Sequence, residues 1–252
     1  MARDWLLGLR GAGATLTRGL VQVLYPGVCL FCRKSLLPHE RDFCPECLAQ
    51  LTTDRHFSCP RCGSTVGPFT PVSDGCSRCR DERLHFEKVF RLGPYDGALR
   101  EIILRMKHFT GESLADAMGE AWSLEIMSRI AQARVSVVVP VPLHWYRRWR
   151  RGYNQSESLA RPLAAKLCLP FRTNVLRRIR NTPSQTQRGG SARRDNVRGA
   201  FVARRDPGIR GKTVLLVDDV LTTGSTASEA AKALQQAGAE RVVVAVLAHS
   251  QY

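Results

Sequence analysis

The segment VLLVDDVLTTGST, residues 214–226, constrains the fold of this chain more than any other stretch. Its first four residues are apolar and bounded by charge and turn signals, which is typical of a fully buried parallel strand. Two adjacent carboxylates, Asp218 and Asp219, follow where this strand is expected to end. A loop of small residues then leads into an alanine-rich helix. This order predicts the carboxyl end of a strand in an open α/β sheet, where ligands bind.

The same segment has the residue types of a ribose phosphate site. Small hydroxyl residues at a helix N-terminus offer backbone N–H groups and the positive end of the helix dipole to a phosphate. Adjacent carboxylates suit the diol of a ribose, or a Mg²⁺ ion that bridges to it. A structural alternative is that the acids only terminate the strand and that Thr226 and Glu229 form a capping box. Because that alternative leaves the acids and the TTG sequence unexplained, we favour a ligand site.

This segment resembles the signature of the type I phosphoribosyltransferases, which bind phosphoribosyl pyrophosphate (PRPP). The resemblance covers every position of the signature. It implies that Asp218 and Asp219 hold the ribose hydroxyls. It also implies that the 5′-phosphate is wrapped by Thr222, Thr223, Gly224, Ser225 and Thr226.

Eight of the nine cysteines form four CxxC pairs. Four such pairs in series indicate structural zinc rather than redox chemistry or disulfides, because two pairs supply the four thiolates of a closed tetrahedral site. A degenerate module that has lost its metal is a further alternative, and sequential or interleaved pairing would both satisfy the spacing. The ninth cysteine, Cys168, is predicted to be a buried apolar residue. The expected ligands of one or two zinc ions are Cys29, Cys32, Cys44, Cys47, Cys59, Cys62, Cys76 and Cys79.

The chain of 252 residues, 44% of them hydrophobic, is long enough for one good core and a small second module. No apolar run approaches the ~20 residues that cross a bilayer. The apolar stretch at the start of the chain is too short and too interrupted to be the apolar region of a signal peptide. Its helical spacing predicts an amphipathic docking helix over residues 1–24. We expect a zinc-finger module over residues 25–84 and an α/β domain over residues 85–252.

Positive charge is concentrated in one region. The net charge is +16, from 38 basic and 22 acidic residues. Residues 143–205 contain fifteen Arg and one Lys but only one Glu and one Asp, a local net charge of +14. A basic region of this strength is expected to face a polyanion or a cluster of phosphates.

The segment WYRRWRRGY, residues 145–153, interleaves arginines with aromatic residues. Such a pattern can stack the bases of a single strand while it neutralises the backbone. Alternatively, the segment is a helix with its two tryptophans buried and its arginines solvated. The long basic stretch of residues 172–205 contains glycine, proline and many polar residues, which predicts a functional loop.

The remaining pattern alternates strands and helices. Strands are predicted over residues 86–95, 135–141 and 241–248, and helices over residues 96–109, 113–132 and from Thr226 to Gly238. This alternation predicts a parallel sheet with helices on both faces.

The order of motifs along the chain resembles the ComF family: CxxC pairs come first, then the WYRRWRRGY segment and the basic stretch, and finally VLLVDDVLTTGST. The resemblance implies a type I phosphoribosyltransferase-like fold with an N-terminal double CxxC–CxxC zinc-ribbon module, Mg²⁺ bound with PRPP, and a cytoplasmic role in DNA uptake during natural competence. It implies that the pyrophosphate faces Lys107 and a basic loop that begins at Pro142 and Leu143 and continues through Arg147, Arg148, Arg150 and Arg151. It further implies a mobile loop over PRPP that includes Thr182, Gln185, Arg188, Arg193, Arg194, Asn196 and Arg198.

Two classes of function are consistent with these residues. The first is a PRPP-dependent phosphoribosyltransferase that also contacts single-stranded DNA and meets proteins of the DNA-uptake machinery. The second is a non-catalytic nucleic-acid-binding protein whose PRPP site is regulatory or vestigial. The ligand site is supported more strongly than catalysis, because no nucleophile–base pair stands out and phosphoribosyl transfer needs none.

Overall fold

A computed structural model of the chain describes residues 27–181 and 197–250. The chain divides into two compact units, Met1–Leu51 and Thr52–Tyr252. This division falls inside the predicted zinc module of residues 25–84, so the second half of the cysteines belongs to the larger unit. The predicted boundaries at residues 24 and 84 stay predictions, and the helix predicted over residues 1–24 lies outside the described residues.

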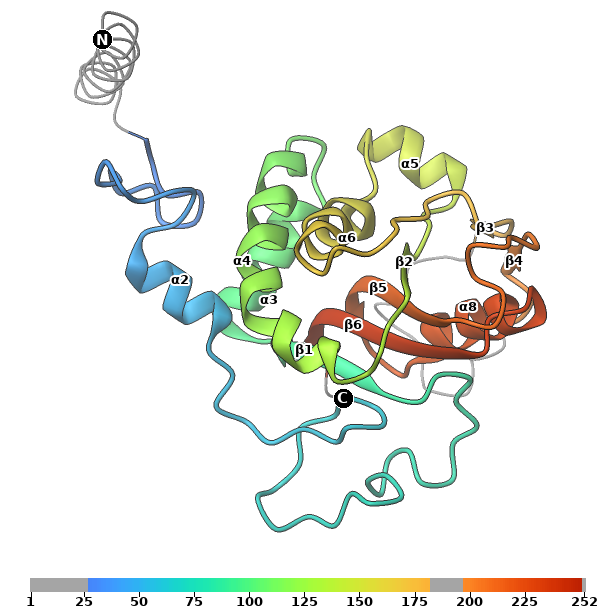
Figure 1. Ribbon diagram of the computed structural model, residues 1–252. Coiled ribbons are helices and arrows are strands. Elements are labelled where there is room, and N and C mark those ends of the chain that lie inside the picture. The colour runs from blue at the N-terminus through green and yellow to red at the C-terminus, as the bar shows by residue number, and fades with distance from the viewer. Residues whose placement is uncertain (1–26, 182–196, 251–252) are drawn as a thin grey trace, which may run out of the picture. The chain divides into compact units, whose positions relative to one another are not determined.

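The larger unit is built on a four-stranded parallel sheet (Figure 1). Its strands are β1 (Val89–Pro94), β2 (Val137–Pro140), β5 (Thr213–Leu221) and β6 (Arg241–His249), in the order β1-β6-β5-β2. Almost every residue of β5 and β6 is buried, as the continuous apolar runs of these strands predict. Because the four strands are parallel, their carboxyl ends lie together at one edge of the sheet.

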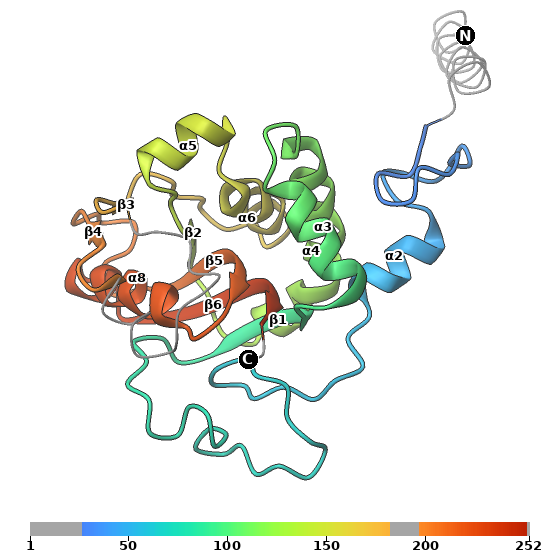
Figure 2. The ribbon, with the colours of Figure 1, turned by 180° about the vertical axis from the view of Figure 1, so that it is seen from behind.

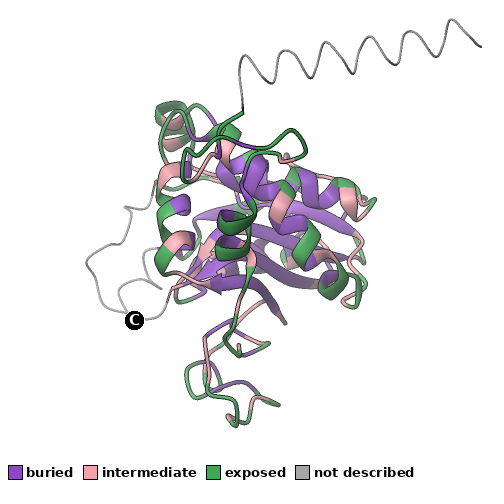
Figure 3. Cartoon of the chain, turned by 90° about the vertical axis from the view of Figure 1, so that its left-hand side faces the viewer, coloured by how far each residue is buried: buried purple, intermediate pink, exposed green. Residues whose placement is uncertain are grey.

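Helices cover both faces of this sheet, as predicted (Figures 1 and 2). On one face lie α3 (Gly97–Met106), α4 (Glu112–Ala131) and α6 (Gln155–Lys166), and on the other lies α8 (Ser225–Gln236). Figure 3 shows buried residues on the strands and on the helix faces turned towards them. The remaining helices are α2 (Pro45–Thr52) and α5 (Trp145–Arg151). None of the helices in the described ranges is both long and apolar enough to cross a membrane.

Four expectations from the sequence are wrong in detail. The stretch of residues 172–205 is not all loop, because β3 (Leu176–Arg178) and β4 (Phe201–Ala203) pair antiparallel within it. The two acids do not follow β5 but lie inside it, since hydrogen bonding to β6 continues to Leu221. Cys168 is exposed, in a left-handed conformation just after α6.

The fourth correction concerns the start of α8. The capping box of Thr226 and Glu229, which belonged to the structural alternative, does not form, because the N-cap residue is Gly224, which has no side chain. The backbone N–H of Ser225 donates to Thr223 Oγ1 at 3.4 Å. Gly224 adopts φ +77°, a conformation that glycine enters without strain. The Glu229 carboxylate instead accepts a hydrogen bond of 3.0 Å from the backbone N–H of Gly199.

Candidate functional site

The two carboxylates of β5 are held by side chains from other elements. Ser156 Oγ donates to Asp218 Oδ1 at 2.8 Å, and Gln155 Nε2 donates to Asp219 Oδ2 at 3.2 Å. Lys107, at the end of α3, forms an ion pair of 3.2 Å with the same oxygen of Asp219. Two helices, α6 and the end of α3, thus hold the acid pair in place.

The electrostatics of the pair are asymmetric. Burial and the neighbouring charge of Asp219 raise the pKa of Asp218 to about 7, although Ser156 opposes this change. Burial also acts to raise the pKa of Asp219, but the charge of Lys107 and hydrogen bonds from Lys107 and Gln155 outweigh it and lower that pKa. In turn, Asp219 raises the pKa of Lys107. Near neutral pH the site therefore contains one firmly ionised carboxylate and one poised to exchange a proton.

A short loop of small residues connects β5 to α8. Thr222 and Thr223 follow the strand, Gly224 turns the backbone, and Ser225 begins the helix. The hydroxyls of Thr223 and Ser225 lie 2.8 Å apart. The loop thus brings the N-terminus of α8 to the same sheet edge as the acids, an arrangement that suits a phosphate.

Basic side chains of α5 and β3 lie near one another, and one of them lies near Asp218. The charge of Arg147 and that of Asp218 both act on Arg178 of β3, and the charge of Arg151 acts on Arg147. Burial lowers the pKa of both Arg147 and Arg178. We call Arg147, Arg151 and Arg178 the inner arginines. Arg178 links this group to the acid pair through the charge of Asp218, and the three arginines carry the positive charge that a pyrophosphate needs.

The other predicted basic residues are placed differently. Arg148 forms an ion pair of 3.5 Å with Glu157, and Arg150 is exposed. Pro142 and Leu143 connect β2 to α5 and are half-buried. Arg198 is exposed, and its carbonyl accepts a hydrogen bond from Arg180. Outside the described residues lie Thr182, Gln185, Arg188, Arg193, Arg194 and Asn196.

The aromatic residues of α5 face solvent. Trp145 is 71% exposed and Trp149 is 77% exposed, so the alternative with both tryptophans buried is wrong. The rings of Tyr146 and Trp149 stack with centroids 6.5 Å apart. Tyr153, in contrast, is buried and donates a hydrogen bond to the carbonyl of Met106. An exposed aromatic stack among arginines is a surface suited to binding a partner.

The eight CxxC cysteines form two sequential groups, so the interleaved pairing is wrong. In each group the four Sγ atoms lie within 4.8 Å of one another. Sγ–Sγ distances of 3.6–3.9 Å within the groups match the edge of about 3.8 Å that a tetrahedron with Zn–S bonds near 2.3 Å has. Both sets fit a structural zinc ion. We call residues 27–51 the first zinc ribbon and residues 57–82 the second zinc ribbon.

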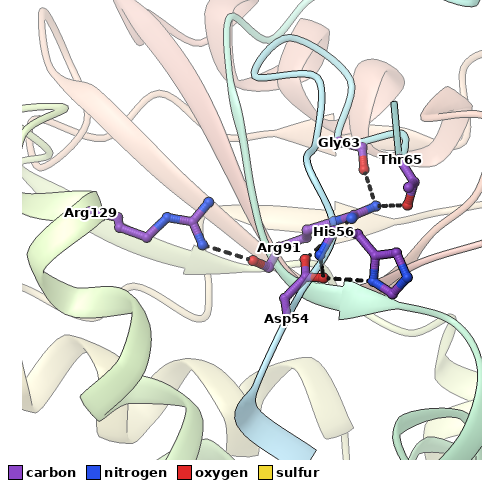
Figure 4. Close-up of polar contacts among 6 residues, drawn as sticks. All are labelled: Asp54, His56, Gly63, Thr65, Arg91 and Arg129. Carbon is purple, nitrogen blue, oxygen red and sulfur yellow. Dashed lines mark hydrogen bonds and ion pairs between the residues drawn. The ribbon is translucent and has the colours of Figure 1, made fainter. Parts of the chain in front are cut away.

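The second zinc ribbon is attached to the sheet by a buried arginine (Figure 4). Arg91 of β1 is 1% exposed, and its Nη1 donates to Gly63 O and Thr65 Oγ1, both at 2.8 Å. Its Nη2 lies 3.2 Å from Asp54 Oδ2. A second contact joins Ser64 Oγ and His249 Nε2 at 3.4 Å. The second zinc ribbon thus packs against β1 and against the end of β6, and it forms a wall beside the carboxyl ends of these strands.

Sequence reasoning missed several residues of this site. Gln155 and Ser156 were not assigned a role, although Asn154 before them is a typical helix N-cap and its side chain does cap α6. Arg178 was not separated from the rest of the basic stretch. Leu84 and Phe86, which pack next to Gly224, carry no local signal at all.

Comparison with known proteins agrees with this architecture. Residues 154–251 match the phosphoribosyl transferase domain family, and residues 20–81 match the double zinc ribbon domain family. Competence protein F of Haemophilus influenzae is 32% identical over 228 residues, which cover 88% of this chain and 96% of that protein. DNA utilization protein YhgH of Escherichia coli K12 is 31% identical over 222 residues, which cover 87% of this chain and 95% of that protein.

Among solved structures, the glutamine PRPP amidotransferase from B. subtilis complexed with ADP and GMP is similar, with a TM-score of 0.39 and 22% identity. The similarity covers 57% of this chain and 30% of that chain. The two sequence relatives match over nearly their whole length, through both the zinc ribbons and the α/β domain. The chain therefore belongs to the ComF family, in which a double zinc ribbon precedes a phosphoribosyltransferase domain.

Proposed function

We propose that this chain binds PRPP together with Mg²⁺ at the carboxyl ends of β5 and β2 and transfers its phosphoribosyl group. The observation that carries the proposal is the acid pair of Asp218 and Asp219, oriented by Lys107, Gln155 and Ser156 beside the loop that opens α8. Two aligned carboxylates hold the ribose diol, and the loop receives the 5′-phosphate. Lys107 and the inner arginines would receive the departing pyrophosphate.

The proposed chemistry needs positioning and charge rather than a nucleophilic side chain. Positive charge develops on the ribose as the bond to pyrophosphate breaks, and the negative charge of an acid pair that holds the ribose diol would stabilise it. Lys107 keeps Asp219 ionised, while the inner arginines take up negative charge on the departing pyrophosphate. Mg²⁺ would screen the charge of the pyrophosphate, and carboxylate oxygens such as those of Asp218 and Asp219 are ligands that it prefers.

A double substitution tests the PRPP site. We expect Asp218→Asn with Asp219→Asn to weaken binding of Mg²⁺-PRPP by at least about 100-fold, or roughly 2.7 kcal/mol, measured by isothermal titration calorimetry. Glu125→Gln, an equally conservative change on the exposed side of α4, is the matched control and should bind as the wild type does. An unchanged affinity in the folded double variant would contradict the proposal.

We further propose that the chain contacts single-stranded DNA through α5 and acts in DNA uptake in the cytoplasm, together with proteins of the uptake machinery. Two observations support a DNA contact: the exposure of Trp145 and Trp149, and the net charge of +14 over residues 143–205. The names of the two relatives, a competence protein and a DNA utilization protein, point to the same process. If PRPP binds but no acceptor is converted, the PRPP site is regulatory and DNA binding is the main function.

Fluorescence anisotropy of a labelled single-stranded oligonucleotide tests this second proposal. Trp145→Ala with Trp149→Ala should weaken binding at least about tenfold, because stacking contributes about 1–3 kcal/mol per base. Leu124→Ala removes an equally exposed apolar side chain from α4 and should have no effect. Arg148→Ala with Arg150→Ala should flatten the salt dependence, since fewer counterions are released. Equal binding by the tryptophan variant and the wild type would exclude α5.

A further inference from the structure

The connection between α5 and α6, residues 152–156, contacts several elements at the carboxyl edge of the sheet. We call it the junction. Its last two residues donate hydrogen bonds to the two acids of β5. Asn154 Nδ2 donates to Val141 O, just after β2, at 3.1 Å. Tyr153 donates to the carbonyl of Met106, the last residue of α3, and so links the junction to that helix.

The Tyr153 hydroxyl is a buried donor with a buried acceptor. Tyr153 is 4% exposed, and burial raises the pKa of its hydroxyl to about 12, so the group keeps its proton near neutral pH. Met106 is fully buried. The carbonyls in the last turn of a helix have no partner within the helix, so a buried one needs a donor from elsewhere. At the end of α3 the Tyr153 hydroxyl is such a donor.

The residue that follows Met106 is Lys107, whose Nζ lies 3.2 Å from Asp219 Oδ2. The Met106 carbonyl and the Lys107 N–H belong to one planar peptide unit. A hydrogen bond that holds this carbonyl therefore also holds the backbone from which the Lys107 side chain starts. That side chain is 34% exposed and has a long flexible stem, so water competes with Asp219 for its amine. A fixed backbone favours the ion pair over the solvated amine.

Two glycines show how closely the turn after α3 is packed. A Cβ atom at Gly111 would lie 2.7 Å from the carbonyl oxygen of Met106, so the backbone after the turn returns to this same carbonyl. A Cβ atom at Gly152 of the junction would lie 3.1 Å from Cε2 of Phe109. The turn that carries Lys107 thus contacts the junction on either side of this residue, at Met106 and at Phe109.

We infer that Tyr153 is a positioning residue for phosphoribosyl transfer: by holding the end of α3, its hydroxyl directs Lys107 to Asp219. The inference rests on the proposed function. Lys107 and Gln155 contact the same oxygen of Asp219. The junction therefore acts on this carboxylate twice, directly through Gln155 and indirectly through Tyr153. The opposing interpretation is that the hydroxyl only satisfies a helix end and contributes to stability alone.

A double-mutant cycle separates the two interpretations. Tyr153→Phe keeps the ring but loses the donor, and we expect it to weaken binding of Mg²⁺-PRPP about fivefold in calorimetry. Lys107→Met should weaken binding further. Addition of Tyr153→Phe to Lys107→Met should then change the affinity by less than about twofold, because no amine is left to position. Equal effects of Tyr153→Phe in the wild type and in Lys107→Met would overturn the inference.

The matched control for Tyr153→Phe is Ser123→Ala. It removes another buried hydroxyl that donates to a backbone carbonyl, that of Gly119 within α4. We expect Ser123→Ala to lower Tm but to leave the affinity for Mg²⁺-PRPP unchanged. Tm and zinc content are recorded for every variant. A loss of PRPP affinity in Ser123→Ala as large as that in Tyr153→Phe would assign both effects to stability and would overturn the inference.

Lysine labelling tests the position of Lys107 without PRPP. The full chain is treated with a limiting amount of acetic anhydride, and acetylation at each lysine is measured by mass spectrometry. Because an amine held against a carboxylate is shielded, we expect acetylation of Lys107 to rise at least about threefold in Tyr153→Phe. Lys166, which pairs with Glu120 at 2.8 Å, is the internal reference and should not change.

The labelling result stands apart from the proposed function. Unchanged acetylation of Lys107 in Tyr153→Phe would overturn the inference, whatever the change in Tm. If the wild type does not bind Mg²⁺-PRPP, the proposed function fails. The labelling then decides by itself whether Tyr153 holds Lys107 against Asp219.

Discussion

Residues 27–36 and residues 57–66 fold in the same way around the first two cysteines of their zinc groups. The backbone N–H of Cys29 donates to Lys34 O at 2.8 Å, and that of Cys59 donates to Ser64 O at the same distance. Val28 bridges Ser35 just as Ser58 bridges Thr65. The residue after the second cysteine has positive φ in both, 67° at Arg33 and 79° at Gly63. Two copies of one zinc-ribbon geometry thus occur in this chain.

The surroundings of the two copies differ. In the first ribbon Cys32, Arg33 and Lys34 are exposed, whereas Cys62 and Gly63 of the second are buried. The second ribbon gains its burial from β1 and β6, and the segment after it packs on the loop that opens α8. There His85 N donates to Ser228 Oγ at 3.1 Å. The same type of metal site can therefore be a separate module, as in the first ribbon, or part of the wall of another site, as in the second.

The largest expected difference between the two ribbons is the effect on PRPP affinity when the zinc ligands of each are removed in turn. We expect Cys59→Ser with Cys76→Ser to lower the affinity for Mg²⁺-PRPP at least about tenfold. Metal binding supplies the folding free energy of such ribbons, so its loss releases Leu84 and Phe86 from Gly224. Calorimetry with PRPP and zinc content per chain are the measurements.

The matched variant removes the other zinc. Cys29→Ser with Cys44→Ser should also lose one zinc per chain but change the PRPP affinity less than about twofold, a difference below roughly 0.5 kcal/mol. Limited proteolysis should then show cleavage within residues 27–51 while the larger unit persists. If both double variants lose the same PRPP affinity, the two ribbons act alike and the comparison fails.

A substitution at Arg91 tests the attachment of the second ribbon to the sheet without removing a zinc ligand. Arg91→Met should destabilise the larger unit by about 3 kcal/mol, because Gly63 O, Thr65 Oγ1 and Asp54 all lose a buried partner. Lys34→Met removes the exposed ion pair of the first ribbon with Glu46 and should leave Tm unchanged. Thermal unfolding followed by circular dichroism measures both. An unchanged Tm in Arg91→Met would mean that the guanidinium contacts add nothing to the stability of the larger unit.

How much could be predicted from the sequence differs between these regions, and the reason is whether the contacts are local or tertiary. The segment from Val214 to Thr226 is local, so its strand, acids and loop could be predicted from consecutive residues. The CxxC spacing likewise revealed zinc. In contrast, the partners of the acids come from α3 and α6, and Arg91 reaches the second ribbon from a separate strand. Such contacts depend on tertiary packing, which leaves no periodic signal in the sequence.

The left-handed residues offer a smaller and opposite pair of effects. Gly63→Ala should destabilise the second ribbon by about 2 kcal/mol, because a side chain at φ +79° is strained and its Cβ would lie 2.8 Å from Val89 Cγ1. Arg33→Gly should stabilise the first ribbon by up to about 1 kcal/mol, since it relieves the same strain in an open position. Rates of zinc transfer to a chelator should therefore rise in the first variant and fall in the second. Changes of the same sign in both variants would contradict the strain that is assigned here to a side chain at these two left-handed positions.

The pH dependence of PRPP binding gives the smallest effect and tests which ribbon communicates with the acid pair. Burial and Asp219 raise the pKa of Asp218 to about 7 in the free protein, and the proposed contact with the ribose diol or Mg²⁺ needs the ionised form. Affinity should therefore be full above pH 7 and fall as pH drops through 7, by up to about tenfold for each further unit.

The two ribbons should differ in their influence on this profile. Because the first ribbon makes no contribution to the described contacts of the acid pair, Cys29→Ser with Cys44→Ser should keep the midpoint near pH 7. Asp218→Asn should bind weakly and without this transition between pH 6 and 8, which separates the carboxylate from titration of the PRPP phosphates. A transition that persists in Asp218→Asn would assign it to the ligand. A midpoint moved by loss of the first zinc would instead couple that ribbon to the site, and the distinction between a separate module and a site wall would not hold.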